Sequence, residues 1–178
     1  MRSMKIALIV VASMTTCLPA LAQQKADLPK EGKYDTMACW SGTQNSVEFS
    51  KNASVQSWEV VGTNRGNPAD SFLDMTTFRC IGSGATLNGK YSARDVCEAV
   101  DKDGDKIITR FVTEGQKTTV DMAVGTGKYE GITRKGGTEP VGTFPTVKPG
   151  TVQGCDHNVG TYTLGPEASG TTTAPPKQ

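Results

Sequence analysis

The chain has 178 residues and 20 glycines, and its 19 basic and 18 acidic side chains give a formal net charge of +1. This length suits one domain with a sizeable core and leaves no room for two. The near-neutral charge offers no electrostatic basis for binding nucleic acid or an anionic membrane. We therefore expect a single domain with no nucleic-acid partner.

Residues 1–22 have the features of a cleaved secretory signal peptide. Arg2 and Lys5 provide the positive start, an apolar stretch follows from Ile6, and the segment ends in a small-x-small sequence at Ala22. The apolar stretch is too short for a membrane span, and no later stretch is long enough. We predict a mature chain that begins at Gln23, lies in the periplasm or outside the cell, and has no membrane span.

Cys17 lies inside this leader and raises the alternative of a lipoprotein. The residues before it, Met14 to Thr16, lack the small residue that lipidation requires directly before the cysteine. Cleavage after residue 22 would leave 156 residues with 17 basic and 18 acidic side chains, a net charge of −1.

Four cysteines remain in the mature chain: Cys39, Cys80, Cys97 and Cys155. An even number in an oxidising compartment favours two disulfides. The alternative is a zinc site, but no two cysteines have the short spacing of zinc ligands, and His157 is the only histidine. We predict disulfides and no metal or other cofactor.

The composition predicts an all-β domain. Gly, Thr and Val recur at short intervals, and no window of a dozen residues keeps apolar positions at helical spacing. After a flexible segment 23–32, the first two strands are expected at 33–43 and 54–63. These contain Trp40 and Trp58, which either pack in the core or line the mouth of a pocket.

Three two-residue turns predict an antiparallel meander over residues 73–124. Asn88-Gly89 and Asp103-Gly104 suit type I′ turns, and Gly115-Gln116 suits type II′. If each turn has two residues, the pairing of the strands is fixed, although Gly82 and Gly84 offer places for a bulge that would shift the first pairing by one.

The first turn places Cys80 opposite Cys97 in a non-hydrogen-bonded pair, where the Cα atoms are close enough for a disulfide. We therefore predict a Cys80–Cys97 bond. By elimination Cys39 pairs with Cys155, which would join the first strand to the C-terminal region.

The same pairing sorts side chains onto two faces, because alternate residues of a strand point the same way. One face is mostly apolar and is predicted to be buried; it pairs Ile81 with Val96, Val96 with Phe111, Phe111 with Val120, Val100 with Ile107, and Ile107 with Val124. The other face is predicted to be exposed and carries the Cys80–Cys97 disulfide and two charge pairs, Asp101 with Lys106 and Arg110 with Asp121.

Arg79 and Glu98 fall opposite each other on the predicted buried face, and Thr109 and Met122 continue their row. An interior ion pair is costly unless it is well hydrogen-bonded, so the pair is either a structural strut or the polar floor of a ligand cavity. The predicted ligand-binding residues are Arg79, Glu98, Thr109, Phe111 and Met122.

Beyond the meander, strands are expected at 128–134 and 158–164, with a long loop at 136–154 rich in Gly and Pro and a disordered tail at 165–178. About eight antiparallel strands in one domain close into a barrel or form a sandwich. A disulfide between the first strand and the C-terminal region favours closure. We predict one closed barrel over residues 33–164.

The segment GTGKYEGI at 125–132 follows a strand and the DxDGD turn at 101–105. This order resembles the allene oxide cyclase and dirigent superfamily and is similar to its uncharacterised exported bacterial relatives. The resemblance covers residues 73–134. It implies an eight-stranded barrel that binds apolar small molecules or radical-derived intermediates, with a homo-oligomer as one option, and it supplies no catalytic residue.

Other chemistries have little support. The aspartates at 101, 103 and 105 invite a calcium site, but Val112 stands where the bidentate glutamate is required. GTGKYEGI lacks the GxGxxG spacing of a dinucleotide site, and no serine lies in a GxSxG sequence. His157 follows a Gly-rich stretch and is expected to be solvated. Asn52-Ala53-Ser54 matches a glycosylation sequon.

The preferred hypothesis is an exported, non-enzymatic barrel that binds a small apolar or amphipathic molecule. One alternative is an isomerase or cyclase that uses the same interior, for which no catalytic residue is proposed. The other is an envelope or secreted interaction protein with a solid core and a contact loop at 136–154.

Overall fold

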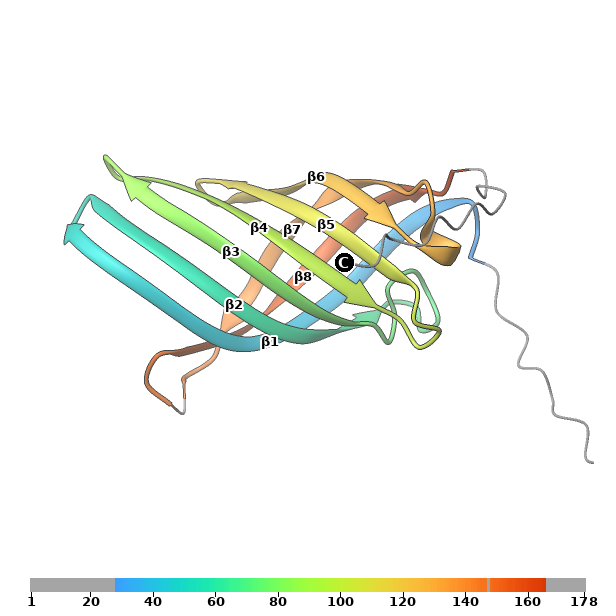
Figure 1. The fold of residues 1–178 in the computed structure, drawn as a ribbon, viewed down its shortest axis with the longest axis horizontal. Coiled ribbons are helices and arrows are strands. Elements are labelled where there is room, and N and C mark those ends of the chain that lie inside the picture. The colour runs from blue at the N-terminus through green and yellow to red at the C-terminus, as the bar shows by residue number, and fades with distance from the viewer. Residues whose placement is uncertain (1–27, 147, 166–178) are drawn as a thin grey trace, which may run out of the picture.

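The structure is a computed structural model that describes residues 28–146 and 148–165. Eight antiparallel strands form a closed barrel in which each strand pairs with its neighbours in chain order, and β1 pairs with β8 (Figure 1). The strands are β1 (Glu31–Ser50), β2 (Ala53–Gly66), β3 (Thr77–Leu87), β4 (Lys90–Val100), β5 (Lys106–Glu114), β6 (Lys117–Gly125), β7 (Thr133–Thr143) and β8 (Thr151–Thr163), with a 3-10 turn η1 (Gly127–Tyr129) before β7. The predicted closed all-β barrel is confirmed.

The predictions for the signal peptide 1–22, for the first half of the segment 23–32 and for nearly all of the tail 165–178 lie outside the described residues. β1 begins two residues before the predicted barrel boundary at residue 33. None of the described residues belongs to a helix long and apolar enough to cross a membrane.

Both predicted disulfides are present. Cys39 of β1 is bonded to Cys155 of β8, and Cys80 of β3 is bonded to Cys97 of β4. Each bond joins residues that lie directly opposite each other on neighbouring strands, with Cα atoms 4.1 and 4.0 Å apart respectively. The Cys39–Cys155 bond therefore fastens the two strands that close the barrel.

The first predicted turn is also confirmed. Asn88 and Gly89 have φ angles of 53° and 75°, the left-handed values that a type I′ turn requires. Cys80 pairs with Cys97 along β3 and β4, with no register shift at Gly82 or Gly84.

The predicted pairing of β4 with β5 is wrong by one residue. Val100 pairs with Lys106 instead of Ile107, because the connection is a five-residue loop from Asp101 to Asp105. The Asp101 side chain accepts hydrogen bonds from the backbone N–H groups of Asp103 and Asp105, at 2.8 and 3.1 Å. This side-chain capture of the backbone competes with a two-residue turn.

A second shift lies between β5 and β6. Glu114 pairs with Lys117 and Phe111 with Val120 as predicted, but Arg110 pairs with Met122, which leaves one extra residue on β6. A bulge of this kind turns every residue beyond it to the other face. Val124, predicted inside, is therefore 49% exposed.

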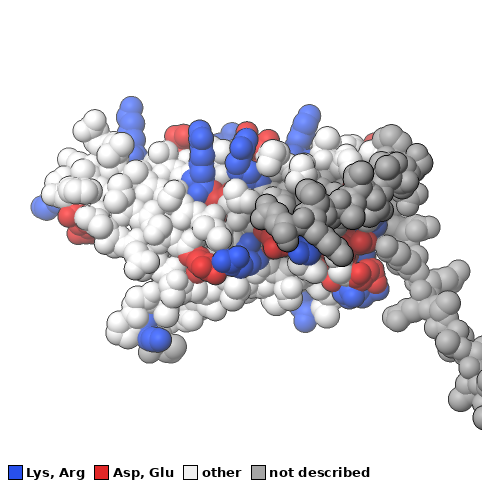
Figure 2. All heavy atoms as spheres, viewed as in Figure 1, with Lys and Arg blue, Asp and Glu red and all other residues white. Residues whose placement is uncertain are grey.

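The face of β3 and β4 predicted to be buried is in fact the outer face. Ile81 and Val96 are 52% and 45% exposed, whereas Cys80 is 6% exposed and the Cys80–Cys97 bond lies inside the barrel. Of the predicted charge pairs, Arg110 with Asp121 is present on the outside, whereas Lys106 contacts Glu98 instead of Asp101. Figure 2 shows basic and acidic side chains next to each other on the visible surface.

The predicted loop at 136–154 is wrong, because most of it belongs to β7 and β8, and only residues 144–150 connect them. The predicted strand at 128–134 is wrong for its first part, which overlaps η1, and β7 starts only at Thr133. Glycines here serve close packing: a Cβ on Gly160 would lie 2.1 Å from the Lys135 carbonyl oxygen and 2.5 Å from the Tyr34 hydroxyl. High glycine content therefore does not mark a loop in this barrel.

An aromatic cluster fills one end of the barrel, where β1 and β7 begin. Its buried members are Tyr34, Phe72, Leu73, Ile107, Tyr129, Ile132 and Tyr162. The connection between β2 and β3 supplies Phe72, whose ring stacks on Tyr162 with centroids 4.2 Å apart. We call this cluster the plug.

Candidate ligand cavity

A cavity of about 750 Å³ occupies the barrel between the plug and the opposite end. All eight strands contribute side chains to its wall. Leu73 of the plug lies at one end, and the exposed turn residues Gly115 and Gln116 lie at the other. The cavity therefore has a closed floor and a mouth at the end where the short hairpins lie. The interior is not filled, in contrast to what the solid-core alternative requires.

Two of the five predicted ligand-binding residues line this cavity. Thr109 and Phe111 point inward from β5 and are 3% and 9% exposed. Met122 lies beyond the bulge of β6 and is 40% exposed on the outer face. The single extra residue of the bulge is the reason that Met122 does not follow Thr109 inward.

Arg79 and Glu98 also lie on the outer face, so their predicted interior position is wrong. They are opposite each other as predicted. The Arg79 guanidinium instead forms an ion pair with Glu59 at 2.8 Å, and the Lys106 ammonium contacts Glu98 at 2.5 Å. The side chains of Arg79 and Glu98 are 53% and 42% exposed, respectively. The apolar side of the β3–β4 hairpin faces outward, because this barrel carries many apolar residues outside and polar residues inside.

Arg134 is the buried charge at the floor, and no pattern in the sequence singles it out. It points inward from β7, is 9% exposed, and donates a hydrogen bond from Nη1 to the Thr109 hydroxyl at 3.2 Å. Its buried Nε–H has no hydrogen-bond partner. Burial lowers the pKa of Arg134, and the nearby Tyr34 hydroxyl opposes that effect; a guanidinium nevertheless stays protonated in proteins.

Aromatic rings surround the Arg134 guanidinium. Its central carbon lies 4.4 Å from the centroid of the Tyr34 ring, 5.7 Å from that of Phe111 and 5.9 Å from that of Phe72. Within residues 28–146 and 148–165, no carboxylate forms an ion pair with it. Ring faces attract a cation but accept no strong hydrogen bond, so the guanidinium keeps donor capacity toward the cavity.

Two carboxylates form a second polar group on the wall. Asp95 of β4 and Asp156 of β8 both line the cavity. Burial, and next the charge of Asp156, raise the pKa of Asp95 to about 6. Burial also raises the pKa of Asp156, while a hydrogen bond of 2.7 Å from the Trp40 indole N–H favours its ionised form. Because the charge of Asp156 acts on Asp95, the two carboxylates do not ionise independently.

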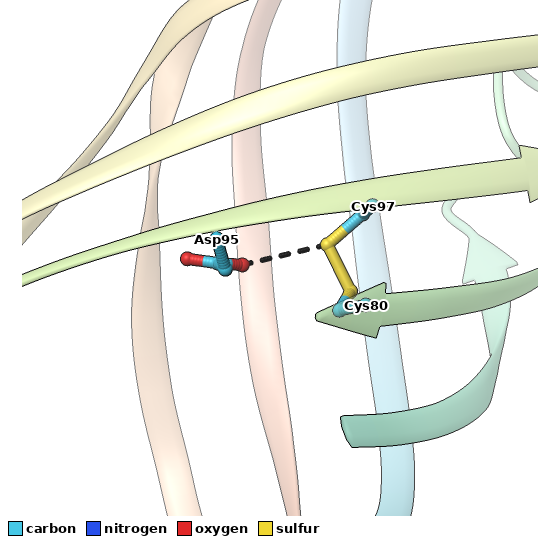
Figure 3. A group of neighbouring side chains, drawn as sticks. All are labelled: Cys80, Asp95 and Cys97. Carbon is cyan, nitrogen blue, oxygen red and sulfur yellow. Dashed lines mark hydrogen bonds between the residues drawn. A yellow bond between two sulfur atoms is a disulfide. The ribbon is translucent and has the colours of Figure 1, made fainter. Parts of the chain in front are cut away.

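Asp95 lies beside the inner disulfide, as Figure 3 shows. Its Oδ2 is 3.4 Å from the Cys97 sulfur, and Cys80 completes a group whose ligand atoms lie within 4.8 Å of one another. Both sulfurs belong to a disulfide, so neither carries a hydrogen to donate nor a thiolate to bind a metal. The contact is therefore a packing contact, and the group is no metal centre while the disulfide is intact.

The mouth is lined by amides and aromatic rings. The Gln44 side chain donates to Gln56 at 3.0 Å, and Gln56 donates to the Tyr91 hydroxyl at 2.8 Å. Trp40 and Trp58 both line the cavity. His157 contributes nothing here, because its ring contacts Asp35 at 2.8 Å and its side chain is 35% exposed.

Comparisons of this chain with family models, with curated proteins and with solved structures gave no match. The function must therefore be argued from the cavity. From floor to mouth, the described part of its wall presents a guanidinium without an ion pair, two carboxylates, and the amides of Gln44 and Gln56. Such a wall is suited to a small molecule that has both apolar surface and polar groups.

Proposed function

We propose that this barrel is an exported binding protein for a small amphipathic molecule held in the cavity. The observation that carries the proposal is the cavity itself, with its closed floor, its mouth and its mixed lining. A volume of about 750 Å³ falls within the range of small-molecule sites. A chain that only needed stability would gain from filling such a space, because each buried void costs packing energy.

The proposal of export rests on the N-terminal sequence, and the two disulfides are compatible with it because such bonds persist in oxidising compartments. The proposed relationship to the allene oxide cyclase and dirigent superfamily is also compatible with the eight-stranded barrel. Fold likeness alone does not supply a reaction.

Binding of N-phenyl-1-naphthylamine, a neutral probe that fluoresces in apolar surroundings, tests the proposed function. We expect saturable binding of one probe per barrel. Thr113→Trp narrows the mouth from the inside and should abolish probe binding. Val96→Trp adds the same ring on the outer face and should leave probe binding intact. Absence of saturable binding, or equal binding by both variants, would overturn the proposal.

An isomerase or cyclase is the second candidate, and Asp95 is the observation that favours it. A carboxyl group with a pKa of about 6 inside a cavity is suited to accept and return a proton near neutral pH. If the barrel is an enzyme, a molecule that copurifies with the Asp95→Asn variant should be converted when the unmodified protein is added, as followed by mass spectrometry. An unchanged molecule would leave binding as the function.

A further inference from the structure

We propose that the cavity selects a ligand with an anionic group, such as a carboxylate, which pairs with Arg134 at the floor while the rest of the molecule extends toward the mouth. This proposal rests on the proposed binding function and adds the chemical class of the ligand and its orientation. It starts from the Arg134 guanidinium, a full positive charge that is 9% exposed and has no carboxylate partner among the described residues.

The energetic state of Arg134 is the first support. A buried charge is stable only when it is paired and hydrogen-bonded, because transfer from water costs several kcal/mol per ion. The Thr109 hydroxyl accepts one hydrogen bond, and three aromatic rings supply cation–π contacts. The Nε–H still lacks a partner. An anion arriving through the cavity would supply the missing negative charge and could accept hydrogen bonds from the part of the guanidinium that lines the cavity.

The shape of the floor is the second support. A guanidinium presents donors in a planar fork that matches the two oxygens of a carboxylate. Thr109 and Phe111 hold the guanidinium from β5, and Tyr34 holds it from β1. The group is thus fixed before a ligand enters, and little side-chain freedom would be lost on binding.

The carboxylate pair determines the orientation. Between β7 and β8, Arg134 lies opposite Tyr162 of the plug, whereas Asp156 lies opposite Pro140. Asp156 is therefore nearer to the mouth than Arg134. Asp95 and Asp156 together repel an anionic group from the middle of the cavity once they are ionised. The favourable position for the anionic end is therefore the floor, and hydrogen-bond donors elsewhere on the ligand would suit the two aspartates.

Displacement of N-phenyl-1-naphthylamine by two ten-carbon competitors tests the inference at pH 8. Decanoate and decan-1-ol share the chain and differ in the charge of the end group. We expect decanoate to displace the probe at a concentration at least tenfold lower than decan-1-ol. Equal competition would overturn the inference and leave the proposed function standing, whereas a failure of the probe itself to bind would refute the proposed function.

Two arginine variants test whether the preference for decanoate depends on Arg134. Arg134→Met should remove the preference for decanoate and leave the affinity for decan-1-ol nearly unchanged. Arg79→Met removes an arginine from the outer face, where it pairs with Glu59, and should keep the preference. If both variants keep it, the anion does not bind at Arg134 and the inference fails.

Arg134 also packs in the barrel, so its removal risks unfolding. Arg134→Lys keeps the positive charge and removes the forked donors, and it serves as the second variant. We expect at least a tenfold loss of decanoate affinity with decan-1-ol unaffected. A lower melting temperature together with an unchanged preference would show that Arg134 is only structural.

Discussion

Replacing Asp95 by asparagine should stabilise the ligand-free barrel at alkaline pH and have little effect in acid. Asp95 lines the cavity, where burial and the charge of Asp156 raise its pKa from an ordinary 3.8 to about 6. Asparagine has a similar shape and no charge, and its amide N–H can donate to Asp156.

The size and sign of the change in the free energy of unfolding follow from the raised pKa of Asp95. Between about pH 4 and pH 6 the folded chain holds a proton that the unfolded chain has lost, so the free energy of unfolding falls as the pH rises through this window. Above pH 6 the ionised Asp95 destabilises the folded chain by its full amount, on the order of 3 kcal/mol, since one pKa unit corresponds to about 1.4 kcal/mol. Below pH 4 the group is neutral in both states, and the cost disappears.

Urea unfolding followed by tryptophan fluorescence at pH 4 and pH 8 measures the effect. Asp95→Asn should raise the free energy of unfolding by roughly 1–3 kcal/mol at pH 8 and change it little at pH 4. Asp121→Asn is the matched control, because its side chain is 42% exposed and contacts Arg110 outside the barrel; we expect no gain from it at pH 8. The same loss of stability at both pH values in Asp95→Asn would refute the reasoning and would indicate that the carboxylate is needed for packing.

Two further predictions concern the closure and packing of the barrel. Replacing both cysteines of Cys39–Cys155 by alanine should cost about 2 kcal/mol more than the same change in Cys80–Cys97, because the enclosed loops span 116 and 17 residues; equal losses in urea unfolding would contradict the loop-entropy argument. Gly160→Ala should cost about 3 kcal/mol, since the new Cβ meets the Lys135 carbonyl oxygen and the Tyr34 side chain, whereas Gly142→Ala, with nothing within 4 Å, should change the melting temperature little. Equal melting temperatures for the two glycine variants would show that the strands separate easily at Gly160.

Local turn chemistry explains which parts of the fold were predictable. Asn88-Gly89 determines a two-residue turn, and that turn alone is enough to place Cys80 opposite Cys97. The Asp103-Gly104 dipeptide carries the same signal but fails, because Asp101 captures the backbone N–H groups of the loop and lengthens it. A side chain outside the dipeptide therefore decided the register of β4 and β5.

The candidate site was predictable only in part, since two of the five predicted ligand-binding residues line the cavity. Thr109 and Phe111 of β5 face the cavity as predicted, whereas the bulge in β6 turns Met122 outward. Arg79 and Glu98 lie opposite each other as predicted, but on the outer face. Alternation along a strand shows which residues share a face, but it does not show which face is inside when the interior is polar and partly empty.

The sequence by itself determined the all-β class, the closed barrel and both disulfides. Turn sequences set how neighbouring strands pair, and once Cys80 is paired with Cys97, only Cys155 is left for Cys39. Only the tertiary structure decided which side of each strand faces the cavity, and it alone brought Arg134 of β7 to Thr109 of β5 and Asp95 of β4 near Asp156 of β8. These contacts depend on barrel closure and on two one-residue shifts of register. Barrel closure leaves no local pattern in the sequence, so the polar wall of the cavity becomes visible only when all eight strands are in place.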